Sequence, residues 1–175
     1  FSGNTDLGVS IVDRVATISI PNVNWNGSET ITFRATDPGA LFDDDPATFT
    51  VTNVNDAPVI TEGSTASVTM SMNGVPNPFA LTLHATDVDI TDTLTWSISS
   101  QASHGTASAS GTGTSKEIGY TPTTNYVGPD SFVVQVSDGH GGVDTITVNV
   151  TISLVTHTIS GTVGVAGVSV AYTGG

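Results

Sequence analysis

Apolar and polar residues alternate along most of this chain. Four stretches show the pattern most clearly: residues 79–86, 93–99, 131–137 and 144–152. In the last of them, Ile146, Val148 and Val150 are separated by Thr147 and Asn149. A period of two is typical of a β-strand with one buried face, and no segment keeps a helical period over a useful length. Glycine and proline clusters between the stretches indicate turns, so the pattern predicts an all-β sandwich.

The sequence also contains an internal repeat. The segment Pro21–Glu29 matches Pro122–Asp130, because proline, asparagine, an aromatic residue, glycine and an acid recur in step. We expect a longer loop at Leu41–Pro46 in the first copy, after which residues 48–51 match residues 145–148. Self-similarity of this kind is typical of tandem repeat domains.

Charge and composition narrow the function classes. The chain has 175 residues and a net charge of −13, from 16 acidic and three basic residues. Nucleic acid is therefore excluded as a partner, and an anionic membrane would repel the chain, whereas cations suit its surface. No apolar run reaches the ~18 residues that a membrane span needs, so we expect no membrane insertion.

Cysteine is absent, which excludes disulfides and thiolate metal sites. A composition rich in threonine, serine, asparagine and glycine, and poor in lysine, is typical of a protein secreted to the cell surface of a microbe. We therefore expect an extracellular, bacterial protein.

Several short motifs occur in an order that is known from one family. They are Asn55-Asp56-Ala57-Pro58, Asp87-Val88-Asp89 followed by Asp92, Asn125-Tyr126-Val127-Gly128, and Ser137-Asp138-Gly139. Together they resemble the cadherin-like, immunoglobulin-like tandem repeats of large bacterial surface adhesins and RTX-type adhesins. The resemblance implies tandem Greek-key β-sandwiches that serve in adhesion and are not enzymes.

With this family in view, we expect one complete and two partial domains. Residues 1–54 form the C-terminal part of a cadherin-like domain, and residues 55–153 form a complete one. Residues 154–175 form the opening strands of a further Ig-like domain or an assembly tail. The neighbouring repeats of the same polypeptide are the expected partners.

The resemblance further implies calcium at the junction between the domains. Carried over by position, the ligands are Asn53, Asn55, Asp56, Asp87, Asp89 and Asp138. Ala57 replaces the last asparagine of the family's linker, so one or two ions are expected rather than three.

Calcium chemistry agrees with these residue types, because Ca²⁺ takes carboxylate and amide oxygens. We expect Asp87 and Asp89 to project to the same side of an extended segment, and the clustered carboxylates to raise one another's pKa without an ion. Any single aspartate is more simply a turn residue. Asp43-Asp44-Asp45 is best read as a solvated loop.

Motifs for catalysis are missing from the sequence. No histidine pair has zinc spacing, and no serine lies in a nucleophile elbow. Trp96 alternates in phase with Leu94 and Ile98, so we expect it in the core, and Trp25 is expected to pack at a strand entry.

Three functions remain open at this point. The first is an adhesive or structural spacer rigidified by calcium, with an unknown surface receptor or glycan as target. The second is a filament in which the tail of one chain adds strands to the incomplete first domain of an identical subunit. The third is a carbohydrate-binding accessory domain of a secreted enzyme, with Trp25 as the platform.

Overall fold

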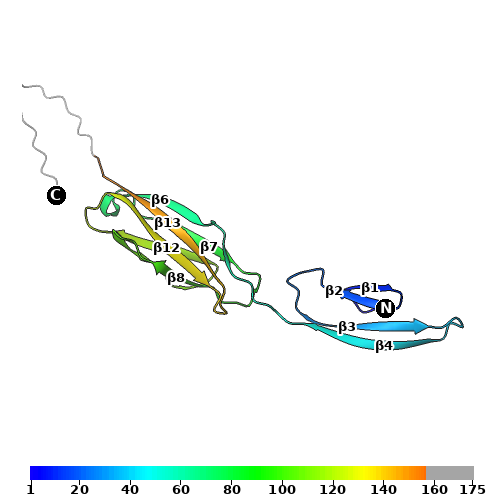
Figure 1. The fold of residues 1–175 in the computed structure, drawn as a ribbon. Coiled ribbons are helices and arrows are strands. Elements are labelled where there is room, and N and C mark those ends of the chain that lie inside the picture. The colour runs from blue at the N-terminus through cyan, green and yellow to red at the C-terminus, as the bar shows by residue number, and fades with distance from the viewer. Residues whose placement is uncertain (157–175) are drawn as a thin grey trace, which may run out of the picture.

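In the computed structural model, which describes residues 1–156, two β units lie end to end and are joined by an extended linker (Figure 1). The first unit contains β1 (Gly8–Val12), β2 (Val15–Ser19), β3 (Gly27–Thr36) and β4 (Phe42–Val51). The second contains β5 (Val59–Ile60), β6 (Thr65–Ser71), a 3₁₀ turn (Met72–Gly74), β7 (Leu81–Thr86), β8 (Thr95–Ser100), β9 (Gly105–Ser108), β10 (Gly111–Thr112), β11 (Ser115–Pro122), β12 (Gly128–Ser137) and β13 (Val143–Ser153). The expected tail strands beyond residue 156 lie outside the described residues.

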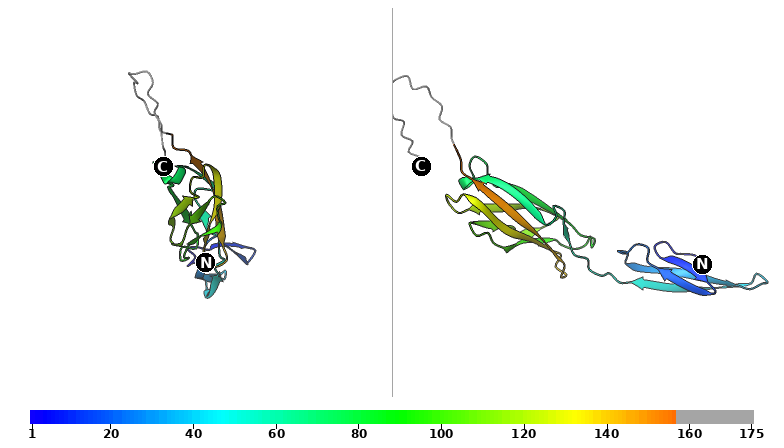
Figure 2. Two further views of the ribbon diagram at one scale, coloured as in Figure 1. Left: turned by 90° about the vertical axis from the view of Figure 1, so that its left-hand side faces the viewer. Right: turned by 45° about the horizontal axis from the view of Figure 1, so that its top comes forward.

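The second unit is a sandwich of two sheets, as the alternation predicts (Figure 2). One sheet has the order β10-β8-β12-β13-β6, and the other has the order β5-β7-β11-β9. All pairs are antiparallel except β13 with β6, which is parallel. The all-β fold class is therefore confirmed. No helix within residues 1–156 is long and apolar enough to cross a membrane.

The core of the sandwich is formed by the apolar face of each alternating strand. Phe132, Val134 and Val136 of β12 are all at most 1% exposed, and they pack with Ile146 and Val148 of β13. Burying such side chains contributes about 1.5–3 kcal/mol each, which is the main driving force for the fold.

Trp96 lies in this core, as its position in the alternation predicts. It is 1% exposed, and its indole N–H donates to the carbonyl of Gly113 at 2.7 Å. The hydrogen bond satisfies the one polar atom that the side chain would otherwise bury unpaired.

The first unit consists of two hairpins, β1-β2 and β3-β4. The hairpin β1-β2 corresponds to the pair β9-β11 of the second unit, and the hairpin β3-β4 corresponds to the pair β12-β13. Ser2 bridges Thr32 of β3, in the place where β8 pairs with β12. Residues 1–51 thus show the strand order and pairing of the later strands of the second unit.

The expected loop at Leu41–Pro46 is wrong. β4 begins at Phe42, and Asp43 pairs with Ala35 within the β3-β4 ladder. The two hairpins close alike, since Thr36 pairs with Phe42 and Ser137 pairs with Val143.

In consequence, the expected match of residues 48–51 with residues 145–148 is also out of register. Glu29 and Asp130 hold the same place in the repeat, and their partners across the ladder are Phe49 and Val150. The three aspartates Asp43, Asp44 and Asp45 remain exposed on the strand. Asp44 forms an ion pair with Arg34 at 2.7 Å, and the charges of the other two stay solvated.

A buried acid recurs at the start of the long strand in both units. Asp130 is 9% exposed and accepts hydrogen bonds from the Tyr120 hydroxyl at 2.7 Å and from the N–H groups of Ser103 and His104. Glu29 likewise accepts hydrogen bonds from Thr5 and from the N–H of Leu7. Each acid ties the loop that precedes β9 or β1 to the long strand of its unit.

The Asp130 carboxylate is held ionised. Burial raises the pKa of the Asp130 carboxyl, but hydrogen bonds from Tyr120 and from the N–H groups of Ser131, His104 and Ser103 outweigh burial, so the pKa lies below its usual 3.8. The carboxylate therefore stabilises the fold fully above that usual value, and the stabilisation is lost as the pH falls through the lower folded-state value.

Replacing Asp130 by alanine is expected to lower the free energy of unfolding by about 1–3 kcal/mol, because it leaves buried donors unpaired. Urea unfolding at neutral pH measures this loss, and the difference from wild type should shrink at acid pH. Glu117→Ala, at an exposed position of β11, is the matched control and should change little. Equal stability of wild type and Asp130→Ala at neutral pH would contradict the expectation.

Candidate metal centre

The pole of the second unit that faces the linker carries most of the predicted site residues. Asp87 comes directly after β7, and Asp138 comes directly after β12. These strands belong to different sheets, so their ends meet at the pole only because the sandwich is closed. The linker, residues 52–58, runs over the same pole.

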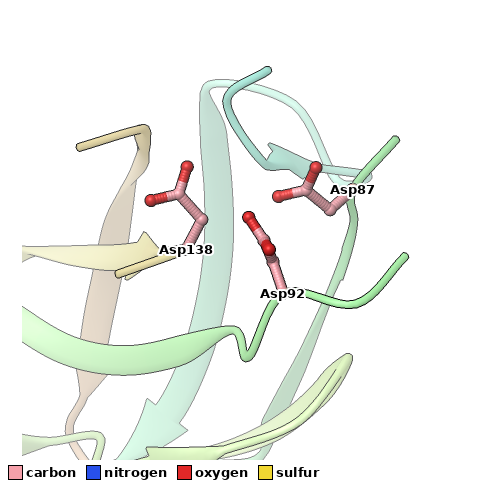
Figure 3. Close-up of side chains that lie close together, drawn as sticks. All are labelled: Asp87, Asp92 and Asp138. Carbon is pink, nitrogen blue, oxygen red and sulfur yellow. The ribbon is translucent and has the colours of Figure 1, made fainter. Parts of the chain in front are cut away.

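Three carboxylates converge there (Figure 3). Asp87, Asp92 and Asp138 each place one oxygen so that all three oxygens lie within 4.8 Å of one another. Asp138 is 2% exposed and the Asp92 side chain is 8% exposed. One oxygen of Asp87, Oδ2, is buried and has no hydrogen-bond partner among the described residues.

Asp138 connects this cluster to the linker. Its Oδ1 accepts hydrogen bonds from the N–H groups of His140 at 2.7 Å and Gly142 at 3.0 Å, which fixes the β12-β13 hairpin. Its Oδ2 accepts a hydrogen bond from the Asn55 amide at 2.8 Å. The same carboxylate therefore holds its own loop with one oxygen and the linker with the other.

The hairpin role of Asp138 is a turn function that the repeat shares. Asp37 accepts hydrogen bonds from the N–H groups of Gly39 and Leu41 in the first unit. Asp138 differs from Asp37 in its contact with the linker, because its second oxygen accepts a hydrogen bond from the Asn55 amide. One oxygen of Asp138 therefore has the ordinary role of a turn aspartate, and the other oxygen contacts the linker at the junction.

Asp89 faces the linker instead of the three-acid cluster. Its Oδ1 accepts from the Asn53 amide at 2.7 Å, and its Oδ2 accepts from the N–H of Asp56 at 2.8 Å. Asn53 in turn accepts a hydrogen bond from the Asn26 amide of the first unit at 3.1 Å. A chain of hydrogen bonds therefore crosses from the first unit through the linker to the second.

The expectation that Asp87 and Asp89 lie on one extended segment is wrong. The N–H of Asp89 donates to Asp87 Oδ1 at 2.9 Å, and the N–H of Asp92 donates to the carbonyl of Asp89 at 2.9 Å. The loop therefore turns twice. It sends Asp89 to the linker and returns Asp92 to the cluster.

Sequence reasoning did not name Asp92 as a site residue. It belongs to the acidic motif, and its spacing after Asp89 was the available signal. Period-two reasoning cannot follow a chain through a turn, so the direction of its side chain was not predictable. The imidazole Nδ1 of His140 lies 3.0 Å from Asp92 Oδ2 and closes the cluster on one side.

Hydrogen bonds lower the pKa values of Asp138 and Asp89 and so favour their ionised forms. The Asn55 amide, ahead of opposing burial, holds the pKa of Asp138 below its usual value, and the N–H groups of His140 and Gly142 add to the effect. The pKa of Asp89 is lowered first by the Asp56 N–H and then by the Asn53 amide, although the charge of Asp138 opposes this. The expected rise of these pKa values through mutual repulsion is therefore wrong for both residues.

The donor set fits a hard divalent cation. The cluster offers carboxylate oxygens and is adjacent to the Asn55 amide, and the chain has no thiolate to favour a soft metal. The buried, unpaired Asp87 Oδ2 is an acceptor for which a cation would provide the missing partner.

Residues 55–151 match the sequence profile of a family described as Bacterial Ig domain. This chain belongs to the bacterial Ig domain family. The match begins at the linker and spans all but the last two residues of the second unit, so the candidate metal centre lies within the Ig domain and at its entry. The family resemblance drawn from the motifs is thereby confirmed.

Solved structures show the same fold. The Ig domain chain aligns with human mucin-like protocadherin EC1-2 at a TM-score of 0.55 and 15% identity, covering 86% of this chain and 83% of that one. It aligns with human CDH23 EC21-23 at a TM-score of 0.56 and 18% identity, covering 85% of this chain and 51% of that one. At these identities the likeness concerns the cadherin-like fold alone.

An endo-fucoidan hydrolase of glycoside hydrolase family 107 also matches, at 21% identity, covering 89% of this chain. The chain spans only 23% of that protein, and the TM-score of 0.44 is too low to carry an argument. A search of curated proteins found no match.

The approach of the linker imposes a glycine at position 142. A Cβ there would lie 2.1 Å from Asp138 Oδ2 and 2.8 Å from the Cα of Ala57. The corresponding residue of the first hairpin is Leu41, whose side chain is 74% exposed, so the hairpin itself tolerates a side chain. The constraint on Gly142 therefore comes from the Asp138 carboxylate, which accepts the Asn55 amide, and from the linker backbone at Ala57.

Replacing Gly142 by alanine is expected to displace the linker and to cost about 1–3 kcal/mol, as overpacking does. Thermal unfolding measures the loss, and amide chemical shifts of residues 55–58 report the displacement. Val143→Ala changes the next residue, which is 49% exposed, and serves as the control. Unchanged linker shifts in Gly142→Ala would show that the close approach is absent in solution.

Proposed function

We propose that this chain is a non-enzymatic, extracellular structural or adhesive repeat whose interdomain junction is stiffened by calcium. Bacterial Ig domains are usually found outside the cell or at its surface, and the cadherin-like fold fits a repeat of this kind. The observation that carries the proposal is the convergence of Asp87, Asp92 and Asp138 beside the linker, with one buried carboxylate oxygen unpaired.

In this proposal the residues of the junction divide into two groups. Asp87, Asp92 and Asp138 hold the ion, and Asn55 of the linker is bound to one of them, because its side-chain NH2 group donates to Asp138 Oδ2 at 2.8 Å. Asn53, Asp89 and the backbone of Asp56 form a tether that keeps the linker on the pole. The sequence assigned Asn53, Asp56 and Asp89 to the ion itself, and their hydrogen bonds support the tether instead.

Calcium supplies positive charge at a point where three negative groups meet. Its binding would offset the repulsion among the carboxylates and link the two loops of the second unit to the linker through Asn55 and Asp138. The tether already limits the directions open to the linker. The ion would restrict the orientations of the linker further, so that the two units would be held rigidly in line.

Calorimetric titration of the metal-stripped chain with calcium is expected to show saturable binding and a raised melting temperature. Asp92→Asn should weaken the affinity at least tenfold, which corresponds to about 1.4 kcal/mol. Asp45→Asn removes an exposed strand acid and should leave the affinity unchanged. Absence of both heat and thermal shift in the unaltered chain would refute the calcium site.

Asp89→Ala separates the tether from the ion. We expect it to broaden the distribution of interdomain distances in small-angle scattering without calcium, because both linker hydrogen bonds are lost. Its calcium affinity should change less than that of Asp92→Asn. If Asp89→Ala loses more calcium affinity than Asp92→Asn, Asp89 is a calcium ligand and not part of the tether.

A second candidate function rests on an open apolar groove in the first unit. Ile11 and Ile18 of the β1-β2 hairpin and Phe33 and Phe49 of the β3-β4 hairpin line a space of about 710 Å³. The lining also includes four charged residues: Arg14, Arg34, Asp43 and Asp45. In the second unit the matching space is filled by side chains of β6, β7 and β8. We propose that strands from the tail of an identical subunit fill this groove and build a filament.

Electron microscopy and light scattering of the 175-residue chain test the filament, with a chain that ends at residue 153 as the control. The longer chain should form filaments and the shorter one should remain monomeric. Monomers of both at the highest soluble concentration would rule the filament out.

A further inference from the structure

A second pocket opens in the first unit, apart from the acid cluster. It has a volume of about 460 Å³ and lies between the β2-β3 loop and the end of β4, where the linker begins. This volume is within the ~300–1,000 Å³ range of small-molecule sites. All of its lining residues belong to the segments 20–26 and 51–56, so its walls come from the first unit and from the linker.

Trp25 forms one wall of this pocket. Its indole is half-buried and rests on Gly27, since a Cβ at that glycine would lie 3.4 Å from the ring. The same position of the repeat holds Tyr126 in the second unit, where the His104 ring covers it in a parallel stack at 4.1 Å. Within residues 1–156 no ring stacks on Trp25, so the indole is left to line the pocket.

The rest of the pocket wall combines apolar surface with planar polar groups. Val23 and Val54 are 89% and 79% exposed, which is unusual for two neighbouring valines of a soluble protein. Asn24, Asn26, Asn53 and Asp56 also line the pocket, and the Asn26 amide donates to the side-chain oxygen of Asn53 at 3.1 Å. An aromatic wall with a few convergent amide and carboxylate groups suits a ligand that has one apolar face and a rim of hydroxyls.

We propose that this pocket binds one ring of a neutral sugar. The C–H face of a pyranose would stack on Trp25, and its hydroxyls would exchange hydrogen bonds with Asn24 and Asp56. Anionic ligands are excluded from the proposal, because Asp56 lies in the wall and the chain carries a net charge of −13. The inference does not rest on the calcium proposal, since none of the three clustered acids lines this pocket.

The test is a titration of the 175-residue chain with neutral hexasaccharides of glucose, mannose, xylose and galactose, followed by tryptophan emission and by calorimetry. Trp96 is 1% exposed, so a saturable change in emission reports on Trp25. At least one of these probes should bind. Trp25→Ala should weaken its calorimetric affinity about tenfold or more, as the loss of a buried aromatic anchor does.

Asn24→Ala keeps the indole and serves as the second variant if Trp25→Ala does not fold; it should weaken the same probe. Trp25→Tyr should retain part of the affinity, and Phe42→Ala, which removes an exposed aromatic side chain outside the pocket, should retain all of it. A sulfated and a uronate hexasaccharide are the charged controls. The proposal is overturned if no neutral probe binds, if binding survives both Trp25→Ala and Asn24→Ala, or if the charged probes bind more tightly.

Discussion

The junction of this protein depends on the carboxylate of Asp138. One of its oxygens holds the β12-β13 hairpin through two N–H groups, and the other accepts the amide of Asn55 from the linker. The same residue belongs to the acid cluster with Asp87 and Asp92. A single buried acid thus connects a loop, the linker and the acid cluster. Gly142 is required because its backbone lies against both the Asp138 carboxylate and the linker at Ala57.

Ionisation makes this coupling possible. Three carboxylates within 4.8 Å would ordinarily repel one another, yet hydrogen bonds hold the pKa of Asp138 below its usual value. Asp130 follows the same logic at the other end of β12, with a hydroxyl and backbone N–H groups in place of the amide. Hydrogen bonding from N–H groups is therefore the general means by which this acidic chain buries its charges.

The two units share a strand arrangement but differ at a few positions. Asp37 fixes its hairpin as Asp138 does, and Glu29 ties its loop as Asp130 does. Two residues depart from the repeat where the proposed functions lie. Gly142 of the junction stands where the first unit has Leu41, and Trp25 of the pocket stands where the second unit has a covered Tyr126. The contacts that both units share belong to the fold, and the contacts found in one unit alone belong to the junction or to the pocket.

The sequence alone determined the strands, the buried face of each, the place of Trp96 and the motifs that meet at the junction, because period-two alternation and short motifs are local. Only the tertiary structure decided where Asp92 points, since two turns separate it from Asp87, and that Asp89 tethers the linker. It also placed Asp43 in β4, because Ala35 pairs with it across the ladder and a solvated edge accepts its charge. Direction after a turn and pairing between distant strands are properties of the folded chain, which no local pattern encodes.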